Sequence, residues 1–238
     1  MRINQTSSML GMLFYILAVV TGLFLIVIST WADMEADSYG FPRRASATLR
    51  ELACPILLTR NEIGTISLKV SNPTDRPLHP SARTEISADL DPQVFVESLD
   101  LAPGESKRLN WSLRPENIVL GNFIFANVQV YASYPIPNRE KTCGILIMDL
   151  PGSGKVIVVV LTVFAVIGLV WGLYSMSKSG LSKTRGSNTW NAILFLSVLI
   201  AAGLIFSFMG SWIPSIGILV LAVLISVLLL NLTLFHEG

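Results

Sequence analysis

The sequence has few charged residues over most of its length. Asp, Glu, Lys and Arg make up 14% of its 238 residues, whereas about a quarter of an ordinary soluble domain is charged. Hydrophobic residues make up 52%, and the mean hydropathy is +0.61. Fifteen of the 16 acidic and 12 of the 17 basic residues lie in residues 32–152. The composition therefore predicts an integral membrane protein with one water-exposed segment.

The exposed segment also lacks the groups that most chemistry needs. Its net charge is −3, and it has no basic stripe to neutralise phosphates, so we expect no nucleic-acid partner. The only histidines are His79 and His236, and neither a His-Glu-x-x-His nor a Gly-x-Ser-x-Gly motif is present. We therefore expect no metal, no cofactor, no small-molecule ligand and no catalytic site.

Four long uncharged runs are each long enough to cross a bilayer, which takes about 20 helical residues. The predicted spans are residues 9–31, 156–177, 189–209 and 215–235. The first could instead be a cleavable signal peptide, because small residues stand near its end at Ser29 and Ala32. Its apolar run exceeds the usual 7–15 residues of a signal peptide, however, which favours an uncleaved signal anchor.

Basic residues in short loops predict the orientation in the membrane. The loop at residues 178–188 carries Lys178, Lys183 and Arg185 and no acidic residue, and the N-terminal segment 1–8 carries Arg2. Basic loops stay on the cytoplasmic side. We therefore expect both termini inside and residues 32–152 outside, in the cell membrane of a prokaryote, with the lipid bilayer around the four helices.

The exposed segment has the pattern of a β-domain. Residues 32–47 show no apolar period and are interpreted as a linker, whereas within residues 48–150 apolar and polar residues alternate repeatedly. Turn residues separate the runs, and no amphipathic helix between them could serve as a crossover. We expect an antiparallel sandwich whose strands cover residues 52–58, 64–70, 82–88, 93–98, 107–113, 122–134 and 142–150.

Three short stretches of this segment resemble a known family. They are Asn72-Pro-Thr-Asp75, Leu99-Asp-Leu-Ala-Pro-Gly-Glu-Ser106 and Leu109-Asn-Trp-Ser-Leu113. Their turns are similar to those of bacterial immunoglobulin-like modules of the cell-adhesion-related and NPCBM-associated type. The resemblance implies an immunoglobulin-like sandwich, inserted between the first and second membrane helices, and it implies no activity.

Cys54 and Cys143 are the only cysteines. They fall in the first and last predicted strands, which can lie side by side in an immunoglobulin-like sandwich. The outside of the membrane favours oxidation, so we expect a disulfide. Two free buried thiols or a redox pair are the alternatives, although the chain has no Cys-x-x-Cys motif.

Small residues recur at helical spacing in two of the predicted spans. They are Gly168 and Gly172 in one, and Gly203, Ser207 and Gly210 in another. Such patterns let helices approach closely. The contacts could be among this protein's own four helices or with another membrane subunit.

The leading hypothesis is a non-catalytic accessory subunit of a multisubunit membrane complex. Its helices would assemble laterally with other integral membrane subunits. Its sandwich would dock on the complex or cap it outside the membrane. The alternative is a surface binding protein that recognises an external ligand through loop aromatics, with Tyr39, Phe41 and Tyr134 as candidates. A third possibility is a membrane enzyme that uses external carboxylates.

Overall fold

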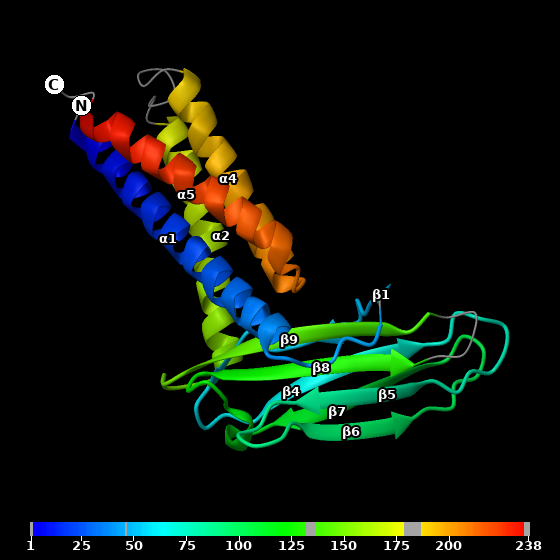
Figure 1. Ribbon diagram of the computed structural model, residues 1–238. Helices are drawn as coiled ribbons and strands as arrows, with labels where there is room; N and C mark the ends of the chain where they lie inside the picture. The colour runs from blue at the N-terminus through cyan, green and yellow to red at the C-terminus, as the bar shows by residue number, and fades with distance from the viewer. Residues whose placement is uncertain (1, 46, 132–136, 179–186, 236–238) are drawn as a thin grey trace. The chain divides into compact units, whose positions relative to one another are not determined.

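The computed structural model describes residues 2–45, 47–131, 137–178 and 187–235. The chain is α+β and divides into two compact units. One comprises residues 1–30 and 157–238 and is called the helical unit. The other, Trp31–Val156, is called the β-domain. Figure 1 shows the helices and strands along the chain, and each unit is described by itself.

The described part of the chain contains four helices that are long and apolar enough to cross a membrane. These are α1 (Arg2–Ser38), α2 (Gly154–Lys178), α4 (Ser187–Phe208) and α5 (Trp212–Phe235). Leu, Ile, Val, Phe and Ala fill them on all sides, as expected of helices in contact with lipid rather than with a soluble core. They agree with a multi-pass membrane protein and lie close to the four predicted spans.

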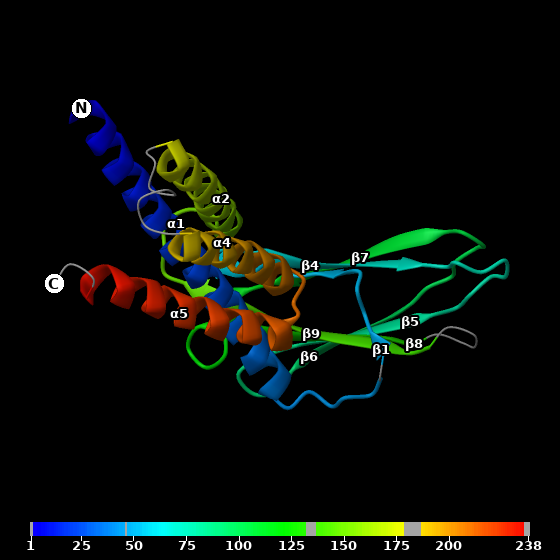
Figure 2. The same cartoon turned by 90° about the horizontal axis from the view of Figure 1, so that it is seen from above.

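The strands of the β-domain form two sheets. One contains six strands in the order β1-β9-β8-β5-β6, with β3 also paired to β9, and the other contains β2-β4-β7. Figure 2 separates β4 and β7 from β5, β8 and β9 as two layers. The bounds are β1 Ala47–Thr48, β2 Leu52–Ala53, β3 Leu57–Thr59, β4 Gly64–Ser71, β5 Ser81–Ile86, β6 Gln93–Ser98, β7 Ser106–Leu113, β8 Phe123–Tyr131 and β9 Arg139–Met148.

The alternation in the sequence builds the core between the sheets. In β4, Ile66 and Leu68 are fully buried while Thr65 and Lys69 face solvent. The inward residues of β7, β8 and β9 join them in one continuous cluster. Because side chains alternate across a strand, this period of two sends one face of each strand inward.

The first predicted strand is in fact two short strands in different sheets. Residues 52–58 were expected to form one strand, but β2 pairs with β4 and β3 pairs in parallel with β9. Pro55 lies between them. Proline lacks the N–H that a continuous ladder needs, so the chain leaves one sheet there and joins the other.

The predicted linker is also largely structured. Helix α1 continues past Trp31 to Ser38, and Ala32 and Ala36 are buried against Phe123 and Phe125 of β8. The segment after the helix is fixed too, because the backbone N–H groups of Arg44 and Ala45 donate to the Glu140 carboxylate at 2.7 and 2.9 Å. Residues 32–45 thus cover one face of the six-stranded sheet.

Candidate functional site

The covered face of the six-stranded sheet contains several buried polar side chains. On its inner strands Asn127 and Gln129 are both buried, and the Gln129 side chain donates to the carbonyl of Pro42 at 3.1 Å. Glu85 of β5 is buried beside Arg83, with 2.6 Å between the charged groups. These partners satisfy the side chains of Gln129 and Glu85, whereas the buried side-chain oxygen of Asn127 has no hydrogen-bond partner among the described residues.

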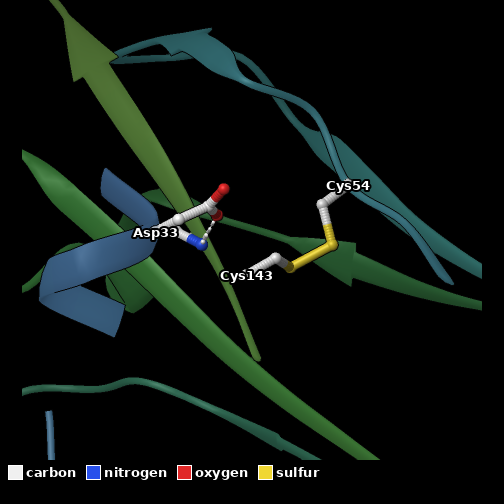
Figure 3. The surroundings of a disulfide bond; sticks show 4 residues. Asp33, Cys54 and Cys143 are labelled. Carbon is white, nitrogen blue, oxygen red and sulfur yellow. Dashed lines mark hydrogen bonds between the residues drawn. A yellow bond between two sulfur atoms is a disulfide. The ribbon is translucent and has the colours of Figure 1, made fainter. Parts of the chain in front are cut away.

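Asp33 holds helix α1 against β9. Its carboxylate is buried and accepts a hydrogen bond from the backbone N–H of Gly144 at 3.1 Å (Figure 3). A side chain at Gly144 would overlap the backbone carbonyl of Ala32, so only glycine allows this approach of helix to strand. Burial lowers the pKa of the nearby Lys141 ammonium, and the negative charge of Asp33 opposes this. The carboxylate and the ammonium therefore stabilise each other's charges.

Cys54 and Cys143 form a disulfide next to this contact (Figure 3). Cys54 directly follows β2 of the smaller sheet, and Cys143 belongs to β9 of the larger one. Their Cα atoms lie 6.5 Å apart, and 89 positions separate them in the sequence. The bond joins the two layers where the chain changes sheets, which matches the pairing expected from the sequence.

Glu62 closes the other end of the domain, where helix α2 begins. Its carboxylate accepts hydrogen bonds from the Ser153 hydroxyl at 2.6 Å, the Gly154 N–H at 2.7 Å and the Thr59 N–H at 3.0 Å. Burial opposes the charge, but these bonds keep the pKa of Glu62 below its usual value of 4.5. Because Gly154 is the first residue of α2, the carboxylate also faces the positive end of the helix dipole.

The predicted helix-packing residues lie at contacts within the helical unit where the structure gives their neighbours. A Cβ at Gly168 would meet Ala18, one at Gly172 would meet Tyr15, and one at Gly203 would meet Ile26, all on α1. Ser207 is buried, and its backbone carbonyl accepts a hydrogen bond from the Ser29 hydroxyl at 3.3 Å. Gly210 has a positive φ of 66° in the turn between α4 and α5.

The candidate contact aromatics have different locations. Tyr39 and Phe41 lie 5.1 Å apart between ring centroids, and Tyr39 lies 4.9 Å from Phe125. Burial, together with the negative charge of Asp89, raises the pKa of the Tyr39 phenol. Both rings contribute to the cover over the sheet and are only partly exposed. Tyr134 lies outside the described residues.

A metal site cannot be assembled from the described residues. They contain no group of three or more His, Cys, Asp and Glu side chains suited to hold a metal ion. His79 instead pairs with Asp100 at 2.6 Å on the exposed surface.

Sequence reasoning missed Asp33, Glu62 and Gly144 as positions that hold the domain together. Asp33 lies in the segment predicted to be a linker, and nothing in the sequence around Glu62 indicates its role. Gly144 interrupts an apolar strand, and a glycine in a strand often indicates close approach of another backbone. Gly144 was thus the only residue in the sequence that indicated this contact between backbones.

The comparisons give no family for this chain. A scan against protein-family models and a search of curated proteins found no match. Solved structures match part of the chain. The CARDB domain of a Pyrococcus furiosus protein, solved with di-metal ions, is 14% identical, with a TM-score of 0.34, over 46% of this chain and 99% of that chain.

Two of the other solved structures are glycosidic enzymes. A Paenibacillus cycloisomaltooligosaccharide glucanotransferase is 12% identical with a TM-score of 0.33, and a Listeria innocua β-glucosidase is 16% identical with a TM-score of 0.30. The matches cover 45% and 44% of this chain and 15% of each enzyme. Such partial matches carry no activity over to this chain.

Proposed function

We propose that the protein is a non-catalytic accessory subunit of a multisubunit membrane complex. In this proposal the helices assemble with neighbouring integral membrane subunits, and the β-domain, an immunoglobulin-like sandwich, docks on or caps the complex outside the membrane. Both termini are cytoplasmic, in line with the basic residues of the loop at 178–188.

The observation that carries the proposal is that two of the four helices, α2 and α5, have little surface buried within this chain. In the most apolar 18-residue window, 22% of α2 and 11% of α5 is buried within the protein. One span is enough to tether a domain, yet this chain has four candidates. The remaining surface offers large bulky side chains such as Trp171 and Phe195, both more than half exposed.

The composition of the helices supports an assembly role over transport. No Asp, Glu, Lys or Arg lies in residues 156–177 or 186–235. Ionisable groups inside a membrane usually mark ion pathways and substrate sites. Gly168 and Gly172 of α2 and Gly203 of α4 pack against α1 of this chain, so contacts with another subunit would use other faces of the helices.

Co-purification from the native membrane tests the proposal. The full-length protein, tagged at its C-terminus, is solubilised in mild detergent, and co-migrating proteins are identified and quantified by mass spectrometry. A fixed set of membrane proteins at constant ratio is the expected result. Recovery of the protein alone as a single monodisperse species would overturn the proposal.

The alternative, a surface binding protein, receives less support. It depends on loop aromatics that are free to contact a ligand, whereas Tyr39 and Phe41 contact each other and Tyr39 contacts Phe125. An external ligand bound by the solubilised monomer would favour this alternative.

A further inference from the structure

Strand β6 is the outer strand of the six-stranded sheet (Figure 1). All six of its residues pair with β5 in unbroken register, from Gln93 opposite Ile86 to Ser98 opposite Ser81. Among the described residues, no strand pairs with its other edge. That edge therefore presents a row of backbone N–H and C=O groups to which another strand can bind.

The side chains of β6 are unusually apolar for an outer strand. Val94, Phe95 and Val96 are 48%, 39% and 64% exposed, and Leu90, just before the strand, is 97% exposed. The strand contains neither proline nor lysine, two residues that commonly protect a sheet edge from pairing. Exposed apolar side chains on an open edge are a feature of peptide-binding sheets.

Strand β7, the long outer strand of the other sheet, is different. It pairs with β4, and its outward residues are polar, namely Lys107, Arg108, Asn110 and Ser112. The two edges belong to one domain and have similar lengths. The apolar surface is thus a specific property of β6.

The charges around β6 indicate which kind of partner fits it. Residues 89–100 contain four acidic side chains, Asp89, Asp91, Glu97 and Asp100, and no basic one. A second copy of β6 in antiparallel pairing would place these carboxylates next to one another, which is unfavourable. A segment with an apolar centre and basic ends would complement both the strand and its flanks.

We propose that β6 is a docking edge that binds an extended segment of a partner protein, apolar in its centre and basic at both ends, as an additional strand. This inference rests on the proposed function, because it names the surface through which the β-domain docks. The backbone hydrogen bonds supply affinity, the outward-facing Val94 and Val96 contact the apolar centre, and the acidic flanks attract the basic ends.

A synthetic peptide tests the edge directly. The probe is a fluorescein-labelled, end-capped peptide of sequence Lys-Lys-Val-Thr-Val-Thr-Val-Lys-Lys, titrated with full-length protein in detergent and followed by anisotropy. We expect saturable binding that weakens as salt increases. The same peptide with Glu in place of Lys, and one with proline in place of the two Thr, should each bind at least tenfold more weakly. Equal binding of all three would overturn the inference.

Variants of the protein identify the edge. Val94→Ser with Val96→Ser should weaken binding of the lysine peptide at least tenfold. Asp89→Asn with Asp91→Asn should remove about half of the salt dependence, because Glu97 and Asp100 remain at the other flank. Asn110→Ser on β7 is the matched control and should bind as the wild type does. Unchanged binding by the Val94→Ser/Val96→Ser protein, with unchanged thermal unfolding, would overturn the inference.

Two further measurements distinguish this inference from the proposed function. A photo-crosslinking amino acid at Val96 that joins two copies of this protein would show that a second copy occupies the edge. That result would overturn the proposal that a partner segment with basic ends binds there. Partners that co-purify equally with wild type and with Val94→Ser/Val96→Ser would leave the proposed complex intact and overturn docking through β6. Specific peptide binding without co-purifying partners would support the edge and contradict the complex.

Discussion

Two carboxylates, the buried Asp33 and the partly exposed Glu62, hold the first and last segments of the β-domain in place. Asp33 accepts a hydrogen bond from the N–H of Gly144, where α1 meets β9. Glu62 accepts hydrogen bonds from Ser153 and Gly154, where α2 begins, and from Thr59 of β3. In each case a charged acceptor binds backbone N–H groups that the regular ladders and helices leave without a partner. Both carboxylates thus have structural roles in the β-domain.

Replacing Glu62 with Gln should destabilise the β-domain at neutral pH. The neutral amide accepts the same hydrogen bonds more weakly, and because the side chain is largely exposed the loss should be about 1 kcal/mol. The lowered pKa of Glu62 means that its stabilisation is present above its usual value of 4.5 and is lost as pH falls through its folded-state pKa. Denaturant unfolding of wild type and variant across this range measures the difference.

The matched control for Glu62 is Glu116→Gln. Glu116 lies on the exposed surface, 3.8 Å from Arg114, and it should change stability little at any pH. A Glu62→Gln loss that persisted undiminished in acid would contradict the role assigned to the ionised carboxylate.

At the scale of elements, sequence periodicity predicted where most strands lie, but not which strands pair with one another in the sheets. The alternation of Ile66, Leu68 and Val70 predicted β4, and the apolar run after Pro92 predicted β6 with the bounds it has. The change of sheet at Pro55 was missed, because a short apolar run does not reveal which neighbour each half will pair with. The disulfide was predicted because both cysteines fell in strands that a sandwich brings together.

The extension of helix α1 to Ser38 was missed for a different reason. Between Asp33 and Asp37 the chain alternates acidic and apolar residues, so no helical stripe is visible, and the partner of Ala36 is a sheet face far along the sequence. Tertiary contacts with the sheet, rather than the local sequence pattern, stabilise the helical conformation of residues 33–38. A long-range pairing of this kind cannot be deduced from the sequence of the segment alone.

Replacing Gly144 with Ala should therefore separate helix α1 from strand β9. The added methyl group would overlap the backbone carbonyl of Ala32, and backbone on both sides leaves little room to adjust. We expect a loss of stability of roughly 3 kcal/mol, at the upper end for overpacking. Thermal unfolding of the β-domain, followed by circular dichroism in detergent, measures it.

Gly64→Ala is the comparison for Gly144→Ala. Its added methyl group would meet the side chain of Leu58, which can rotate away, so the loss should be clearly smaller. Equal losses at Gly64 and Gly144 would contradict the close approach of α1 to β9 as the reason for glycine.

At the scale of the whole molecule, charge is separated along the chain. The β-domain contains nearly all acidic residues, while the loop at 178–188 contains only basic ones. The four apolar helices agree with a multi-pass membrane protein, and the positive-inside rule supplies an orientation. The four apolar helices could be predicted from the sequence because hydropathy is a local property, and the orientation stays a prediction. The open edge at β6 could not be predicted, because its exposure depends on the order of strands in the sheet.

The orientation can be measured with single cysteines, because both native cysteines are bound in a disulfide and do not react with maleimide. In spheroplasts, a membrane-impermeant maleimide should label Asn110→Cys at once and should label Lys183→Cys only after the membrane is permeabilised. Asn110 is exposed on β7, and Lys183 belongs to the basic loop, so both sites are sampled without touching the core. Immediate labelling of Lys183→Cys with protection of Asn110→Cys would reverse the topology and place β6 in the cytoplasm, where any docking partner would have to be sought.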